Sequence, residues 1–132
     1  MYTNKDIRCF IMTRNRADLL VDSLNSLLAQ KGGPWDIWVI DNSTDNKTED
    51  LIKTKYKDIH YERTQGGTIF VANMERMQSL MTTPYTLTLH DDDLLAPNYL
   101  ENVLKAINCY PDLAGVFSKY SNFTNQNIPA DA

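Results

Sequence analysis

The chain has 132 residues, of which 42% are hydrophobic and 23% are charged, and its formal net charge at pH 7 is -4. This length gives one domain with a substantial core, and this composition is that of an ordinary globular protein. The negative charge argues against a nucleic acid partner, which usually selects a basic face. The sequence shows neither a transmembrane run nor a secretory signal pattern, so we expect a cytoplasmic protein, free or peripheral to the inner face of the membrane.

The first half of the chain predicts two strands and two helices. Residues 7–12 form a nearly continuous apolar run, as a buried parallel strand requires. A helix is expected next, because Asn15 and Asp18 resemble a helix-start pair and leucines then recur on one helix face. Residues 35–41 form the second predicted strand, and the polar turn after them leads into a modest helix around residues 51–56.

The second half continues this alternation of short apolar runs and amphipathic segments. We expect a strand at residues 59–63, a helix at 70–81, a strand at 85–90, a helix at 100–107 and a candidate fifth strand at 114–120. Repeated alternation of strand and helix predicts an α/β fold with a mostly parallel sheet of four to five strands flanked by helices.

Polar residues follow the predicted strands, at the edge where open α/β sheets bind their ligands. They are Thr13, Arg14 and Asn15 after the first strand, Asp41 and Asn42 after the second, Arg63, Gln65 and Gly67 after the third, and Asp91, Asp92 and Asp93 after the fourth.

The three consecutive aspartates are the strongest of these signals. A surface run of acids is usually a solvated loop, but this one follows a buried strand directly and precedes the apolar pair Leu94 and Leu95. Oxygen-rich clusters suit hard cations such as Mg²⁺ or Mn²⁺, which in turn suit a phosphate-bearing substrate. Consecutive residues of an extended segment point to alternate faces, so Asp91, Asp92 and Asp93 need not all bind one ion.

Asp41 ends the second predicted strand and has two candidate roles. It can form an Asx turn for the segment that follows, or it can bind a ligand. Because Thr44 or Asp45 is better placed to start the next helix, we expect Asp41 to remain free to accept a hydrogen bond from a ligand.

Four segments in order resemble the family 2 glycosyltransferases. "FIMTRNRADLLVDSLNSLLAQ" resembles a strand that ends in Thr-x-Asn-Arg before a leucine-rich helix, and "WVIDNSTDNKTEDLI" resembles the second strand and its Asp-rich turn. "QGGTIFVANMERM" resembles the segment that leads from Gly to an Asn in the third helix. "YTLTLHDDDLLAPNYLENVL" resembles the strand that bears the DxD motif, and the match extends from residue 7 to about residue 107.

The resemblance implies a GT-A fold and assigns roles to the matching positions. Thr13, Arg14 and Asp41 would hold the nucleoside base, usually uracil, with Asn15 beside them in the same motif, and Gly67 and Asn73 would line the donor pocket. Asp91 would lie near the ribose and the metal, Asp92 would bind Mn²⁺ or Mg²⁺ directly, and Asp93 is a further candidate ligand.

The implied reaction moves a sugar from a nucleoside diphosphate sugar, with a UDP-sugar as first choice, to a hydroxyl of a saccharide or lipid-linked acceptor, with inversion. His90 departs from the family pattern because it stands where many members carry the first Asp of DxD. The general base is a second departure: family members are longer, and we expect this base beyond Ala132, since Asp131 does not match its context.

We therefore interpret residues 1–121 as a donor-binding half-domain and residues 122–132 as a polar tail, in a chain that is inactive or weakly active alone. The surface that a second half would cover is expected to expose apolar groups around residues 115–117 and Tyr120, which favours self-association.

Two alternatives to the glycosyltransferase interpretation remain open from the residues alone. A sugar nucleotidyltransferase uses a similar sheet and metal, but it normally has a Gly-rich basic loop after the first strand, and "TRNRADLL" has no glycine. A receiver-like module that binds Mg²⁺ normally has paired acids after its first strand, where this chain has Thr13, Arg14 and Asn15.

Overall fold

A computed structural model of the chain describes residues 1–65, 69–124 and 127. Its elements are the 3-10 helix η1 (Asn4–Asp6), β1 (Ile7–Thr13), α1 (Ala17–Leu28), β2 (Asp36–Asp41), α2 (Lys47–Lys55), β3 (His60–Arg63), α3 (Ile69–Leu80), β4 (Tyr85–His90) and α4 (Tyr99–Cys109). The four strands form one sheet in the order β3-β2-β1-β4, and every neighbouring pair is parallel. The predicted α/β fold with a parallel sheet is confirmed.

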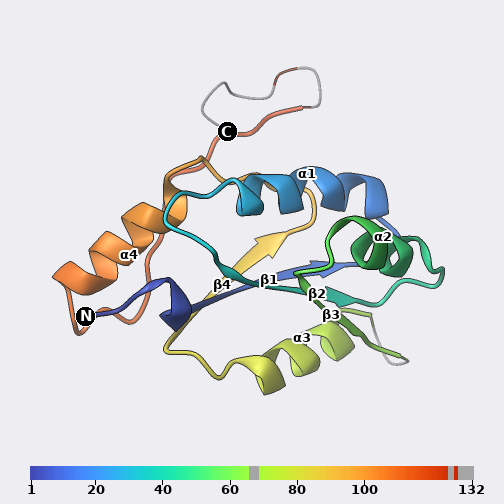
Figure 1. Ribbon diagram of the computed structural model, residues 1–132, viewed down its shortest axis with the longest axis horizontal. Coiled ribbons are helices and arrows are strands. Elements are labelled where there is room, and N and C mark those ends of the chain that lie inside the picture. Colours follow the sequence, from blue (N-terminus) through green and yellow to red (C-terminus); the bar gives the residue numbers. More distant parts are fainter. Residues whose placement is uncertain (66–68, 125–126, 128–132) are drawn as a thin grey trace.

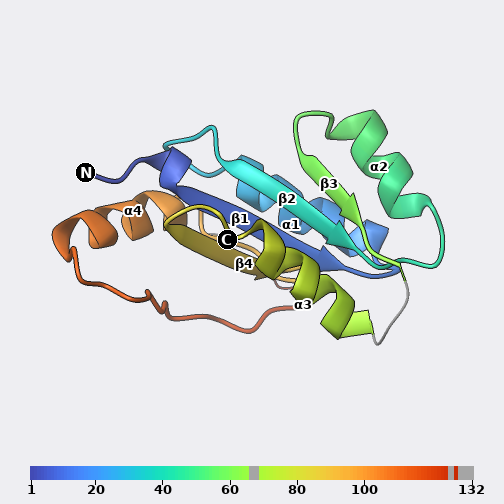
Figure 2. The same ribbon diagram turned by 90° about the horizontal axis from the view of Figure 1, so that it is seen from below.

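The sheet lies between two layers of helices (Figures 1 and 2). Helices α1, α2 and α4 cover one face, and α3 covers the other face. The larger core cluster lies under α1, α2 and α4, and it includes Cys9 and Ile11 of β1. The smaller cluster lies under α3 and includes Phe10 of β1 and Met77 of α3. Because β1 is buried on both faces, its sequence is apolar at successive positions rather than at alternate ones.

The register brings the carboxyl ends of the strands to one edge of the sheet. Thr13 of β1 lies opposite Asp41 of β2, and Asp41 in turn lies opposite Arg63 of β3. On the other side of β1, Met12 lies opposite His90, the last residue of β4. The polar residues that follow the strands are therefore neighbours in space, as the sequence predicts.

Two predictions about local structure are wrong. Residues 114–120 form no strand in the described part of the chain: Val116 packs against the core, but Phe117 is 99% exposed and no backbone ladder joins this segment to β4. The pair Asn15 and Asp18 does not cap α1, whose N-cap is Arg16 and has no side-chain hydrogen bond.

None of the helices in the described ranges combines the length and the apolar character that crossing a bilayer requires.

Candidate functional site

The ends of β1 and β4 are joined by a side-chain hydrogen bond. Thr13 donates from Oγ1 to Oδ2 of Asp91 over 2.8 Å. Both residues are almost fully buried, with 5% of Asp91 exposed. A buried carboxylate needs hydrogen bonds or a cation to offset its lost hydration. Thr13 supplies one such bond and fixes the orientation of Asp91.

Arg16 supplies the cation. Its Nη1 atom lies 3.1 Å from Oδ1 of Asp91 and 3.2 Å from Oδ2 of Asp92, so two carboxylates meet at one guanidinium nitrogen. The side chains of Arg16 and Asp92 are each about half exposed, whereas that of Asp91 is buried. Sequence reasoning did not select Arg16 as a site residue, although it is the last residue of the Thr-x-Asn-Arg motif.

Asp41 lies buried at the end of β2, with both carboxylate oxygens engaged. Oδ1 accepts from the backbone N–H of Ser43, and Oδ2 accepts from the hydroxyl of Tyr61, each over 2.7 Å. Burial, together with the hydrogen bond to Asp41, raises the pKa of Tyr61 above its usual value. Asp41 therefore forms the Asx turn and holds β3 to β2. Its role toward the nucleoside base stays a prediction.

Asn15 connects the loop after β1 to the loop after β2. Its φ angle of 52° is in the left-handed region, which Asn tolerates better than most residues. In this conformation its backbone N–H donates to Oγ of Ser43, and its side-chain Oδ1 accepts from the backbone N–H of Thr44, each over 2.8 Å. The two loops that follow the central strands are thus fixed relative to each other.

Asn73 reaches the same edge from α3. It is buried, and its Oδ1 accepts from the hydroxyl of Thr64 over 2.6 Å. Its Nδ2 donates longer hydrogen bonds to the backbone oxygens of Thr13 and Ile40, over 3.4 and 3.5 Å. Asn73 therefore connects α3 to the ends of β1 and β2. The other residue predicted from this segment, Gly67, lies outside the described residues.

Arg14 and Arg63 differ in how their guanidinium groups are satisfied. Arg63 donates to the backbone oxygens of Ser43 and Asp45 and to the side chains of Asn46 and Glu49, over 2.9 to 3.0 Å. It therefore holds the turn between β2 and α2. In contrast, Nη1 of Arg14 is buried and finds no hydrogen-bond partner among the described residues. A buried donor in this state favours a bound acceptor nearby.

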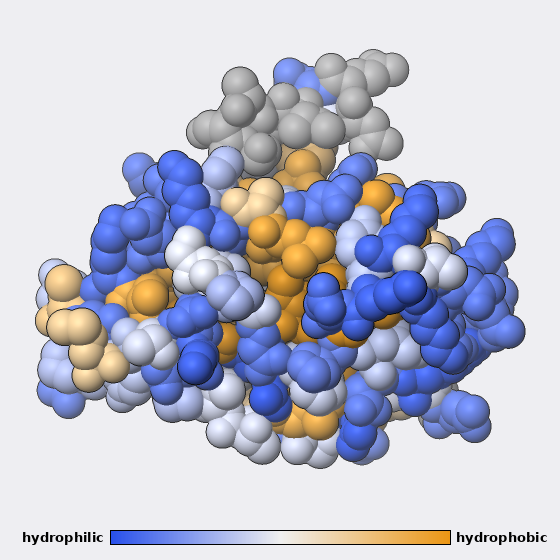
Figure 3. All heavy atoms as spheres, in the orientation of Figure 1, coloured by the Kyte–Doolittle hydropathy of each residue, from blue (hydrophilic) through white to orange (hydrophobic). Residues whose placement is uncertain are grey.

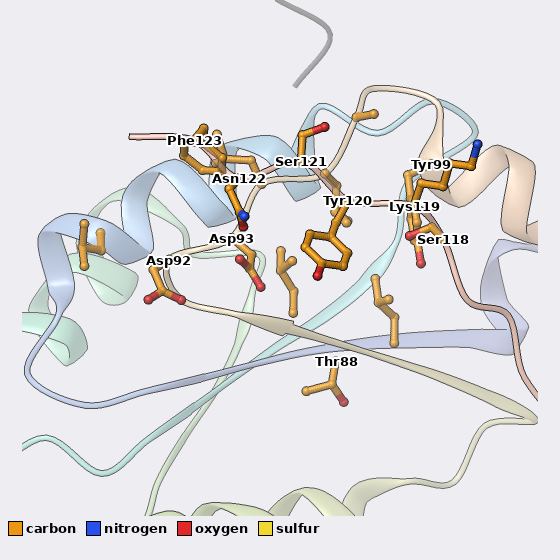
Figure 4. A pocket seen from close by; sticks show the side chains of 16 residues that line it. Thr88, Asp92, Asp93, Tyr99, Ser118, Lys119, Tyr120, Ser121, Asn122 and Phe123 are labelled. Carbon is orange, nitrogen blue, oxygen red and sulfur yellow. The ribbon is translucent and has the colours of Figure 1, made fainter. Parts of the chain in front are cut away.

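A hollow of about 750 Å³ lies beside the aspartates, between β4 and residues 118–123 (Figure 4). Asp93 and the ring of Tyr120 both line it, above β4. The backbone oxygen of Asp93 accepts from the hydroxyl of Ser23 over 2.8 Å, which ties this loop to α1. Aromatic and carboxylate groups thus line one space next to Asp92.

The site brings together two of the three consecutive aspartates, Asp91 and Asp92. Among the residues that the structure describes, no three His, Cys, Asp or Glu side chains lie close enough to hold a metal ion between them. Asp91 and Asp92 nevertheless direct one oxygen each toward the same cationic group. Magnesium sites often use only one or two carboxylates, with water and substrate phosphates as the remaining ligands. The pair therefore fits a divalent cation that arrives with a phosphate-bearing ligand.

Comparison with solved structures identifies similar folds. The crystal structure of S. aureus TarS superposes on this chain with a TM-score of 0.64 at 19% sequence identity. The superposition covers 77% of this chain and 19% of the TarS chain. The structure of TarS 1-349 in complex with UDP gives a TM-score of 0.62 at 20% identity, and the complex with UDP-GlcNAc gives 0.64 at 17%. Each of these two superpositions covers 80% of this chain and 32% of the TarS chain.

These structures confirm the GT-A-type fold, and the chain spans a third or less of their length. No curated protein matches the chain by sequence. The family model for glycosyl transferase family 2 matches residues 9–132, almost the whole chain, which favours this interpretation over a nucleotidyltransferase or a receiver-like module. The chain belongs to glycosyl transferase family 2.

Proposed function

We propose that this chain binds a nucleoside diphosphate sugar, with the UDP-sugars as the preferred candidates. The sugar would be transferred to an acceptor hydroxyl with inversion of configuration at its anomeric carbon. The observation that carries the proposal is the convergence of Asp91 and Asp92 on one cationic group beside Thr13. The TarS structures add support, because TarS binds UDP and the UDP-sugar UDP-GlcNAc on a similar fold.

The nucleoside would bind between the loops that follow β1 and β2. Asn15 fixes these loops together, and Asp41 keeps the second loop in its turn. Arg14 would contribute directly, because a carbonyl or phosphate oxygen of the donor would accept from its buried Nη1. Asn73 would support the pocket from α3, and we keep Gly67 as a candidate on its sequence position alone.

Asp91 and Asp92 would hold the divalent cation, Mn²⁺ or Mg²⁺, with the diphosphate and water supplying the other ligands. When bound, such a cation neutralises charge that develops on the departing diphosphate. Thr13 donates to Oδ2 of Asp91, so Oδ1 would be the oxygen that meets the cation. Asp93 lies next along the chain and is a further candidate ligand, although its side chain lines the adjacent hollow.

The hollow beside Asp92 is the proposed entry for a saccharide or lipid-linked acceptor. Tyr120 provides an aromatic face there, and Asp93 provides hydrogen-bond acceptors for hydroxyl groups (Figure 4). The general base that deprotonates the acceptor is proposed to lie outside residues 1–132, because the chain spans at most a third of the TarS structures above. Donor binding and sugar transfer are thus separable in this chain, and transfer is expected to be weak or absent.

Thermal unfolding with UDP and Mn²⁺ tests the donor site. A ligand at about 100 times its dissociation constant stabilises the folded state by about 2.7 kcal/mol, which raises the melting temperature of a domain of this size by several degrees. We expect this rise with UDP and Mn²⁺ together and a smaller one when EDTA is present. Asp92→Ala should abolish the dependence on metal while the protein remains folded.

Asp58→Ala is the matched control. Asp58 is exposed and lies just before the amino-terminal end of β3, whereas the site lies at the carboxyl-terminal ends of the strands. It should respond to UDP and Mn²⁺ as the unmodified protein does. An absence of any shift in millimolar UDP with Mn²⁺, or a shift that EDTA leaves unchanged, would contradict the proposed donor site.

A further inference from the structure

We infer that Arg16 is a resident counter-cation of the Asp91–Asp92 pair, which gives way when donor and metal bind, and that it thereby couples the two binding events. The inference rests on the proposed function, since it concerns the same site. Arg16 is a positioning residue in this account: it controls when the aspartates are available for a metal ion.

The hydrogen bonds around Asp91 leave no oxygen of its carboxylate unengaged. Thr13 donates to Oδ2, and Arg16 lies 3.1 Å from Oδ1. Asp91 is 5% exposed, and Oδ1, the oxygen that Thr13 does not occupy, is the one that pairs with Arg16. The same Nη1 atom is 3.2 Å from Asp92. A divalent cation that uses both carboxylates therefore competes with the Arg16 guanidinium for the same two oxygens.

Charge gives this competition a physical reason. Two adjacent carboxylates repel each other, and the repulsion is stronger where one of them is buried. Within the described ranges, Arg16 is the basic residue that forms ion pairs with Asp91 and Asp92. It offsets their repulsion in the free protein. Once a divalent cation takes over that role, the guanidinium has lost its partners and faces a repelling charge, so it is expected to move.

The position of Arg16 gives it a second partner. Residue 16 is the N-cap of α1, and its side chain is about half exposed at the edge where the donor would bind. A guanidinium group pairs well with phosphate oxygens, and the positive end of the α1 dipole favours an anion at the same place. We therefore expect the released guanidinium to pair with the diphosphate of the donor. Each ligand then makes the binding of the other easier, and this coupling is reciprocal.

Direct measurement of Mn²⁺ binding by electron paramagnetic resonance, without and with saturating UDP, tests the coupling. Arg16→Gln removes the charge and should bind Mn²⁺ alone roughly fivefold or more tightly than the unmodified chain, while the gain in Mn²⁺ affinity caused by UDP shrinks by a similar factor. Arg16→Lys keeps the positive charge but removes the planar guanidinium, which can donate two parallel hydrogen bonds. It should bind Mn²⁺ alone weakly, as the unmodified chain does, and also show a reduced gain with UDP.

Arg76→Gln is the charge-matched control, because Arg76 lies on α3 and pairs with Glu62 away from the site. It should leave both Mn²⁺ affinities unchanged. Equal affinities in Arg16→Gln, Arg76→Gln and the unmodified chain would overturn the inference and leave the proposed function intact. If the unmodified chain binds no Mn²⁺ even with UDP, both fail together. Circular dichroism shows whether Arg16→Gln folds. If it does not, Arg16→Lys tests the inference instead: a reduced gain in Mn²⁺ affinity with UDP supports it, and an unchanged gain overturns it.

Discussion

The hydroxyl of Thr13 and the carboxylate of Asp91 are joined over 2.8 Å across the boundary between β1 and β4. These residues are 78 positions apart in the sequence, and both are buried. Because Thr13 occupies Oδ2, the other oxygen of Asp91 pairs with Arg16. This hydrogen bond therefore contributes both to the stability of the domain and to the geometry of the site.

Thr13→Val tests both contributions, because valine keeps the shape and removes the hydroxyl. A hydrogen bond to a charged group contributes about 1.5–3 kcal/mol, so we expect the free energy of unfolding to fall by about this amount. The rise in melting temperature caused by UDP and Mn²⁺ should also become smaller, because Asp91 is no longer held in one orientation. Urea unfolding measures the first effect, and thermal unfolding with both ligands measures the second.

Thr88→Val provides a matched control on the neighbouring strand. The Thr88 hydroxyl lies 3.6 Å from the sulfur of Met77, a weak contact, and the residue is exposed. Its substitution should change the free energy of unfolding little. Equal losses in the free energy of unfolding from Thr13→Val and Thr88→Val would contradict a stabilising contribution of the Thr13–Asp91 hydrogen bond.

The Tyr61–Asp41 contact predicts a loss of stability in Tyr61→Phe. The variant leaves the buried Asp41 carboxylate without one of its two hydrogen bonds, which we expect to cost about 1–3 kcal/mol in the free energy of unfolding. Tyr56→Phe is the matched control, because the Tyr56 hydroxyl donates over 3.0 Å to Asn25 at an exposed position. The loss should be smaller there, and urea unfolding of both variants measures the difference.

The same contact predicts a dependence on alkaline pH. Burial, and then the bond to Asp41, raises the pKa of Tyr61 in the folded state, whereas the unfolded phenol titrates near pH 10. Above about pH 10 the unfolded state releases its proton first, so the stability that Tyr61 contributes is full below that pH and is lost above it. The difference in free energy of unfolding between the unmodified chain and Tyr61→Phe should therefore narrow as pH rises through this range. A difference that stays constant would contradict this account.

The turn between β2 and α2 should depend on the fork geometry of Arg63. This side chain donates to two backbone oxygens and two side chains of the turn and of α2. Lysine has one nitrogen and cannot reach all four acceptors, so Arg63→Lys should lower the melting temperature nearly as much as Arg63→Ala. Arg76→Ala, which removes an exposed arginine that pairs with Glu62, should have a smaller effect. A full rescue by lysine would contradict the role of the fork.

The parallel sheet and its polar edge could be predicted from sequence because they depend on local patterns. The apolar run of β1 indicates a strand that is buried on both faces, and parallel connections bring all carboxyl ends to one edge. Thr13, Asp41 and Asp91 therefore meet as expected. Which side chain pairs with which depends on register and side-chain reach, and no local pattern contains that information.

Three features of the structure show this limit. Asp41 was expected to be free, but Tyr61 from β3 reaches it once the strands are in register. No local pattern singles out Arg16, yet it joins two aspartates that lie 75 and 76 positions away. Residues 114–120 have strand-like composition, but composition does not supply a paired neighbour, and the described chain forms no ladder there.

Exposed aromatic side chains near the end of the described chain predict self-association. Phe117 is 99% exposed and Tyr120 is 86% exposed, as expected for a surface around residues 115–120. Apolar side chains also reach the surface in the middle of the face shown in Figure 3. Exposed apolar groups lower their free energy by leaving water, so pairing of two chains through Phe117 and Tyr120 is favoured as concentration rises.

Sedimentation velocity over a range of protein concentrations measures this association. The unmodified chain should sediment faster as concentration increases, and the double variant Phe117→Ser, Tyr120→Ser should remain monomeric. Phe70→Ser is the control, because Phe70 is an exposed aromatic residue on α3, which covers the other face of the sheet. Its association should match that of the unmodified chain, since the patch that drives pairing is intact. A chain that stays monomeric at every concentration, or equal effects of both sets of substitutions, would show that the exposure of Phe117 and Tyr120 does not cause association.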